Sequence, residues 1–226
     1  MALPNGSQVF IEQTRSTTEI EATSITNAKD PVATVAEIGD LVNGDYVLVL
    51  ESVWAGLKNR VLRVKSIDAL KVTLEGDGST DTSNINKFPA GGASTLIKIT
   101  SWIEIPCISD IAKTGGEQQF YTKQCLADER EKQTPTFKSA TSIGYTFDFD
   151  YANPITQLLI GYDEDGKTRA MRMFVPKASY PIRTFSGVPS FDDVPNTVMN
   201  EDETTVLNIS LDGKYTHMKE YVAPTP

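Results

Sequence analysis

The stretch Ser142-Ile143-Gly144-Tyr145-Thr146-Phe147-Asp148-Phe149-Asp150-Tyr151 alternates polar or small residues with large apolar ones. Side chains of a β-strand point alternately to its two faces, so this period of two predicts a strand with one apolar and one polar face. Residues 205–211 repeat the pattern before the turn pair Asp212-Gly213. The two segments together predict a half-buried sheet.

Shorter runs of the same character predict that most of the chain is β. They lie at residues 9–12, 46–50, 61–65, 71–74, 96–99, 120–126, 170–175 and 182–186.

Residues 154–162 have helical rather than strand periodicity. Asn153 can cap a helix, and Pro154 suits the first helical position. The acidic stretch Asp163-Glu164-Asp165-Gly166 is expected to end the helix as a solvated turn. Such a short helix needs an apolar face docked on the sheet. That expected core face consists of Ile155, Leu158, Leu159 and Tyr162.

The chain is expected to divide into two units. Residues 22–95 contain short strands punctuated by Gly, Asp and Thr, and are expected to form a self-contained unit. Residues 1–21, an N-terminal arm with a first strand, and residues 96–226, which end in a loose tail, are expected to form the second unit. The predicted fold class is therefore mainly β.

Charge and hydropathy argue against tight DNA binding and against a membrane-spanning helix. The sequence carries 21 Lys and Arg against 30 Asp and Glu, a net charge of −9. Tight binding of DNA needs an excess of positive charge, so it is not expected. No apolar run approaches the ~20 residues of a membrane-spanning helix. The first residues lack the features of a signal peptide, which predicts folding in the cytoplasm.

The residues that usually carry catalysis are scarce. His217 is the single histidine, with no triad partner nearby, and is expected at the surface or an interface. Cys107 and Cys125 are expected to be reduced, partly buried thiols. No metal site, cofactor or enzymatic activity is predicted. An enzyme that depends on His217 ranks last among the alternatives.

Two sets of motifs resemble known phage proteins. The segments at 25–31, 43–47, 57–64, 74–76, 81–83 and 88–92 resemble a small β-barrel module of phage structural proteins. The motifs Gln157-Leu158-Leu159, Thr168-Arg169-Ala170, Phe185-Ser186-Gly187-Val188 and Thr205-Val206-Leu207-Asn208-Ile209, with 115–120 and 133–136 upstream, resemble siphophage tail tube proteins of the lambda type. A long acidic loop at 189–203 departs from that family's pattern.

These resemblances imply a tail tube β-sandwich with one short flanking helix, formed by residues 1–21 and 96–226 and interrupted by a small β-barrel module at residues 22–95. They also imply a structural virion protein of a long non-contractile tail, assembled in the host cytoplasm. Six copies would form a ring, and stacked rings would form the conduit for DNA ejection. Double-stranded DNA would pass without specific binding. Further implied partners are the tape measure protein inside the tube and the terminator and tip proteins at its ends.

The polar positions of the alternating strands are candidates for the wall of the lumen. These candidates are Asp148, Asp150, Asn208 and Ser210. The alternative function is a surface recognition or carbohydrate-binding module of a virion. It predicts outward-facing aromatic residues on the small barrel, with Trp54 and Tyr46 exposed.

Overall fold

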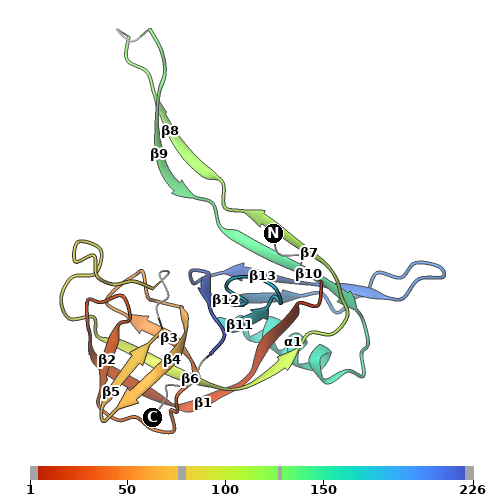
Figure 1. The fold of residues 1–226 in the computed structure, drawn as a ribbon. Helices are drawn as coiled ribbons and strands as arrows, with labels where there is room; N and C mark the ends of the chain where they lie inside the picture. The colour runs from red at the N-terminus through yellow and green to blue at the C-terminus, as the bar shows by residue number, and fades with distance from the viewer. Residues whose placement is uncertain (1–4, 76–79, 127–128, 222–226) are drawn as a thin grey trace.

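The computed structural model describes residues 5–75, 80–126 and 129–221 (Figure 1). The fold is mainly β, as predicted, with one short helix. The elements are β1 Gln8–Ile25, β2 Val32–Val35, β3 Tyr46–Ser52, β4 Val61–Asp68, β5 Lys71–Leu74, β6 Ser94–Glu104, β7 Ile108–Gly115, β8 Gln118–Lys123, β9 Lys132–Lys138, β10 Thr141–Asp148, α1 Pro154–Asp165, β11 Arg169–Phe174, β12 Ile182–Phe191, β13 Thr204–Leu211 and β14 Thr216–Met218.

Most strands belong to one antiparallel sheet. Its order is β2-β5-β4-β3-β6-β1-β11-β12-β13-β10-β7, and β14 pairs with β12. An additional pairing between β1 and β2 closes the first six strands into a barrel, the compact body at the left of Figure 1. Strands β8 and β9 form a separate two-stranded ribbon.

The barrel encloses its own core. Trp54 is 2% exposed, and its indole N–H donates to the carbonyl of Pro89 at 2.8 Å. The Asn27 amide donates to the carbonyls of Thr82 and Phe88, which ties the loop before β6 to the end of β1. Apolar side chains fill the interior, among them Ala33, Val47, Val49, Leu57, Leu62, Val64, Val72, Leu74 and Leu96.

A second core lies between the curled sheet and α1. It includes Val9, Ile11, Tyr145, Phe147, Ile155, Leu159, Met171, Phe185, Leu207 and Ile209. The predicted alternation holds along β13, where Leu207 and Ile209 are buried and Asn208 and Ser210 are exposed. It stops early in β10, which ends at Asp148, so the prediction that the strand runs to Tyr151 is wrong. Tyr151 is 64% exposed in the turn before α1.

The helix is longer than the sequence predicted. The side chain of Asn153 accepts a hydrogen bond from the N–H of Ile155, and Pro154 follows at the first turn. The helix continues through Asp165 and ends where Gly166, at φ 58°, donates to the carbonyl of Tyr162. The acidic stretch after Tyr162 is therefore the last helical turn and its left-handed cap rather than a separate turn.

A third apolar cluster joins the barrel wall to the second part of the sheet. Tyr46, Leu48 and Val61 of the barrel pack with Ala170 and Met218. The long strands β1 and β6 also run through both parts, and their register slips near the middle of β1. The two cores are thus connected by continuous strands and by a shared apolar contact.

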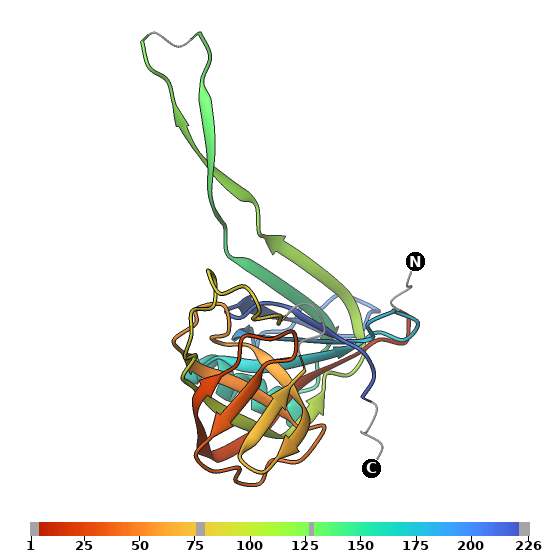
Figure 2. The same cartoon turned by 60° about the vertical axis from the view of Figure 1, so that its left-hand side comes forward.

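The β8–β9 ribbon extends the β7–β10 hairpin away from both cores, as Figures 1 and 2 show. We call this ribbon the arm. The sequence predicted a strand only at residues 120–126 here. Strand β9 lacks apolar alternation because it faces no core, and all seven of its residues are exposed. Strand β7 is exposed between its two ends, and only Ile108 at its start packs against the second core.

Candidate assembly surfaces

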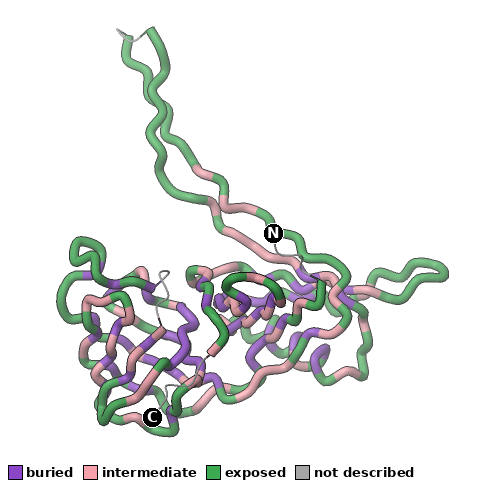
Figure 3. The backbone as a smooth tube through the Cα atoms, in the orientation of Figure 1, coloured by how far each residue is buried: buried purple, intermediate pink, exposed green. Residues whose placement is uncertain are grey.

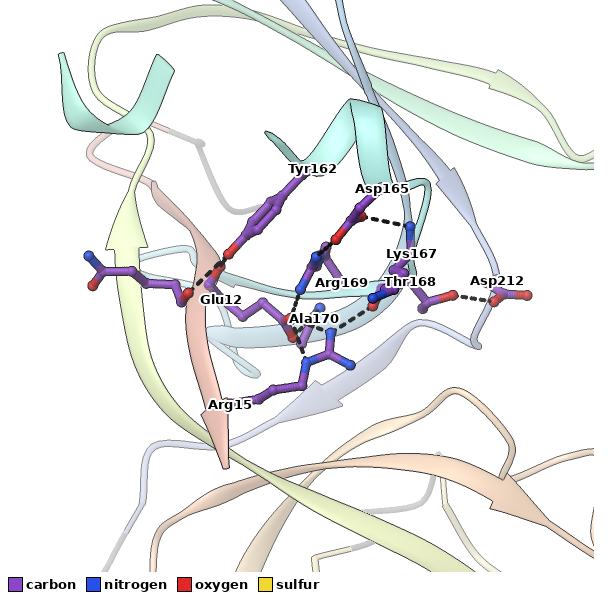
Figure 4. Close-up of polar contacts among 10 residues, drawn as sticks. Glu12, Arg15, Tyr162, Asp165, Lys167, Thr168, Arg169, Ala170 and Asp212 are labelled. Carbon is purple, nitrogen blue, oxygen red and sulfur yellow. Dashed lines mark hydrogen bonds and ion pairs between the residues drawn. The ribbon is translucent and has the colours of Figure 1, made fainter. Parts of the chain in front are cut away.

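A buried carboxylate lies where β1, α1 and β11 meet (Figure 4). Glu12 is 1% exposed. Its Oε1 accepts hydrogen bonds from Arg15 Nε at 2.9 Å and Arg169 Nη1 at 3.3 Å. Its Oε2 accepts one from the backbone N–H of Ala170 at 2.9 Å. Two cations and one amide thus compensate the buried charge inside the protein.

The end of α1 extends this cluster. The Tyr162 hydroxyl donates a shared hydrogen bond to the carbonyls of Glu12 and Gln13, at 2.9 and 3.0 Å. The Arg169 guanidinium lies 3.9 Å from the centroid of the Tyr162 ring and pairs with Asp165. Burial raises the pKa of Tyr162, so its hydroxyl stays protonated and can donate. The cluster holds the end of the helix against two strands.

We find no set of side chains in the described ranges that is arranged for metal binding. No group of three or more His, Cys, Asp or Glu residues could hold a metal ion there. His217 is on β14 and lies opposite Arg183 of β12. Partial burial, and then the charge of Arg183, lower the pKa of His217, which favours its neutral form. None of the described helices has the length and apolar character needed to cross a membrane.

The helical residues expected to face the core lie as follows. Ile155, Leu159 and Tyr162 are buried in the second core, at 2%, 0% and 7% exposure. Leu158 is partly buried and packs against the same cluster.

A polar face covers β10 and β13 opposite the second core. Residues directly opposite in an antiparallel pair project from the same face. Asn208 lies opposite Gly144, and Ser210 lies opposite Ser142. Both Asn208 and Ser210 are exposed. The face therefore carries small or uncharged groups along these two strands.

The two candidate aspartates are placed differently. Asp148, which is exposed, ends β10 opposite Thr204. Asp150 lies outside the strand, where its carboxylate accepts from the N–H of Ala152 at 2.9 Å and its carbonyl accepts from the Thr156 hydroxyl at 2.7 Å. The expectation that both acids share one strand face is wrong, because Asp150 belongs to the turn that starts the helix.

Both cysteines are exposed, although the sequence predicted partial burial. Cys107 lies between β6 and β7 with φ of 49°. Its thiol hydrogen-bonds Asp148, and this contact raises the pKa of Cys107. Asp148 thus holds the start of β7 near the end of β10.

The arm exposes large apolar side chains. Phe120, Tyr121 and Phe137 are 54%, 60% and 68% exposed. Figure 3 shows the ribbon as exposed along almost its whole length, in contrast to the buried cores below it. A two-stranded ribbon with no core is marginally stable by itself. The arm is consequently a surface suited to contact with another protein.

The barrel does not display the aromatic residues that a recognition module would use. Trp54 lies inside the barrel and Tyr46 is 8% exposed, with its ring edge-on to Trp102 at 5.6 Å. The feature that would favour carbohydrate binding is therefore not met at these two positions.

Comparison with known proteins gives the family to which these surfaces belong. No curated protein matches the chain. A family model described as phage tail tube protein, TTP, matches residues 52–220. This range contains the arm, the polar face and the helix, and it is well over half of the 226 residues. The family consists of structural proteins of the virion tail that are not enzymes. The chain therefore belongs to the phage tail tube protein family.

Proposed function

We propose that this chain forms six-membered rings, that the rings stack into a tail tube, and that phage DNA leaves through the tube. The family supports the tail tube itself. The observation that carries the assembly is the arm, where Phe120, Tyr121 and Phe137 are each more than half exposed within one copy. A neighbouring copy in the tube supplies the missing partner surface.

The sheet supports the same conclusion. Among the described strands, β7 pairs only with β10, so its other edge is open. Open edges with unpaired N–H and C=O groups promote strand pairing between chains, and ring closure removes them. A ring in which neighbouring sheets continue one another would therefore satisfy this edge.

The polar face of β10 and β13 is our proposal for the wall of the lumen. Asn208 and Ser210 offer no positive charge to DNA phosphates, and Asp148 adds a negative one. Asp150 remains a candidate at the rim, next to the helix. A wall without cations repels or ignores the phosphates, so DNA slides without being held.

We further propose that residues 22–95 act as an inserted module on the outside of the tube, between residues 1–21 and the tube domain at 96–226. A barrel with its own core adds bulk that a lumen could not accommodate. The tape measure protein inside the tube, and the terminator and tip proteins at its ends, are the further partners that this role requires.

Electron microscopy of the purified full-length protein tests the proposed function. Negative staining is expected to show stacked rings with one axial repeat and six-fold end views. Only monomers, at every protein and salt concentration tried, would contradict the proposal.

Cysteine labelling tests which surface faces the lumen. In a Cys107→Ser, Cys125→Ser background, assembled tubes with Ser210→Cys are expected to react with a small maleimide but not with one carrying a large polymer. Val53→Cys is the control on the barrel, because Val53 is 72% exposed. It is expected to react with both reagents. Equal reaction of Ser210→Cys with the large reagent would place the polar face outside.

A further inference from the structure

A groove lies at the base of the arm. Its volume is about 750 Å³, and it is lined by residues of β7 and β10, by the last residues of β9 and β13, and by the segments that follow those two strands. Ile143, Leu211 and Tyr215 are partly buried against the second core and form an apolar floor. The groove is thus an open continuation of the apolar side of the sheet.

Three lysines line the same groove: Lys113, Lys138 and Lys214. Lys87 lies next to Lys214, and this neighbouring positive charge lowers the pKa of Lys214. Within the described part of the chain, no ion pair joins any of these four lysines to a carboxylate. A carboxylate-rich segment would relieve this repulsion.

One acidic residue, Asp212, also lines the groove. Its carboxylate accepts hydrogen bonds from the Asn59 amide at 2.6 Å and the Thr168 hydroxyl at 2.8 Å. It is engaged with two neutral donors and forms no ion pair with these lysines, so three positive charges face one negative charge in the groove. We call this site the basic groove.

The loop between β12 and β13 has the complementary character. Residues 192–203, which we call the acidic loop, contain five Asp and Glu residues and no Lys or Arg. At its tip Val198 and Met199 are 53% and 87% exposed. The N–H of Glu201 donates to the carbonyl of Val198 at 3.2 Å, which closes a turn. Apolar side chains and carboxylates thus project together.

The acidic loop cannot serve the groove of its own copy. It leaves the sheet at Thr204, while the groove lies at Leu211, the other end of β13. Seven steps along a strand separate these ends by about 23 Å. In Figure 1 the loop projects to the right, away from the base of the arm. A second copy is the occupant that this geometry favours.

We propose that the acidic loop of one copy seats in the basic groove of a neighbouring copy. Val198 and Met199 cover the apolar floor, and the carboxylates at 201–203 approach the lysines. Loop and groove lie at opposite ends of one strand, so the contact is head-to-tail and propagates from copy to copy. This inference rests on the proposed self-assembly and names a contact that drives it.

Charge reversal tests the pairing. The groove variant carries Lys113→Glu, Lys138→Glu and Lys214→Glu, and the loop variant carries Glu201→Lys, Asp202→Lys and Glu203→Lys. Each variant alone is expected to need at least about tenfold more protein to form tubes, because like charges now face each other. An equal mixture of the two is expected to co-assemble, since every contact between unlike variants pairs opposite charges. The chain with all six changes is expected to assemble as well.

The control variant carries Lys71→Glu, Lys167→Glu and Lys177→Glu, which change the net charge as much as the groove variant does. It is expected to assemble like the unmodified chain. Thermal unfolding of each monomer checks that the exposed substitutions leave the fold intact. Normal tubes from both reversed variants, no rescue on mixing, or equal loss in the control would overturn the pairing while leaving the proposed function standing. A failure of the unmodified chain to assemble would instead overturn the proposed function, and this inference with it.

Discussion

Replacing Glu12 with Ala is expected to lower the free energy of unfolding by about 3–5 kcal/mol. The substitution leaves Arg15 and Arg169 without their shared carboxylate, at 21% and 13% side-chain exposure. It also leaves the N–H of Ala170 without its acceptor. A loss of this size corresponds to a fall in Tm of roughly 6–20 °C for a chain of this length.

Thermal and chemical unfolding of the monomer measure this effect. Glu19→Ala is the matched control, because Glu19 lies exposed on the same strand and is expected to change stability by less than about 0.5 kcal/mol. The pair Glu12→Leu with Arg169→Met is expected to recover part of the loss, since it also removes one of the two cations that the loss of Glu12 leaves without this partner. Equal effects of Glu12→Ala and Glu19→Ala would show that the cluster does not hold the helix end.

Deleting residues 118–137 is expected to abolish tube formation while leaving the monomer folded. The deletion removes the apolar surface of the arm, including Phe120, Tyr121 and Phe137. It retains the link between Glu117 and Ser139, whose backbone N–H donates to the Glu117 carbonyl at 2.9 Å. Gly115 and Gly116, at φ 73° and 84°, permit the shortened turn between β7 and β10. Lys138 also stays, so the basic groove keeps its cations.

Electron microscopy detects the tubes, and unfolding experiments show whether the monomer is intact. Monomer stability is expected to change by no more than about 1 kcal/mol, because exposed residues away from a core contribute little. The full-length variant Phe120→Ser, Tyr121→Ser, Phe137→Ser separates the apolar contacts from the length of the arm, and it too is expected to lose assembly. If the shortened chain formed tubes with the normal repeat, the arm would not be needed for assembly.

The sequence was most informative where one face of an element meets a core. Leu207 and Ile209 on β13 follow a period of two, and Ile155 and Leu159 on α1 follow the helical spacing, because burial selects apolar residues at those intervals. Asn153 and Pro154 predicted the start of the helix correctly. Its end was predicted too early, because Tyr162 and Asp165 are held by distant partners on β1 and β11 that no local pattern reveals.

The candidate surfaces were less predictable, because they depend on contacts between segments that are far apart in the sequence. Strand β9 faces no core, and β7 contacts one only through Ile108 at its start, so neither strand has the alternating pattern and the arm was predicted only in part. Glu12 and Arg169 are 157 positions apart, and no local sequence motif predicts that they form an ion pair. The basic groove likewise collects lysines from separate segments of the chain.

The sequence by itself determined that the chain is mainly β, that it carries one short helix, and that no catalytic constellation stands out in it. Those properties depend on local periodicity and on composition. Only the tertiary structure decided that Glu12 is buried between two arginines, and that Asp148 ends a strand while Asp150 lies in the turn before the helix. It also decided that an acidic loop and a basic groove lie at opposite ends of β13. Such features arise when the sheet brings distant segments together, because a side chain's charge and burial depend on neighbours that the order of residues does not specify.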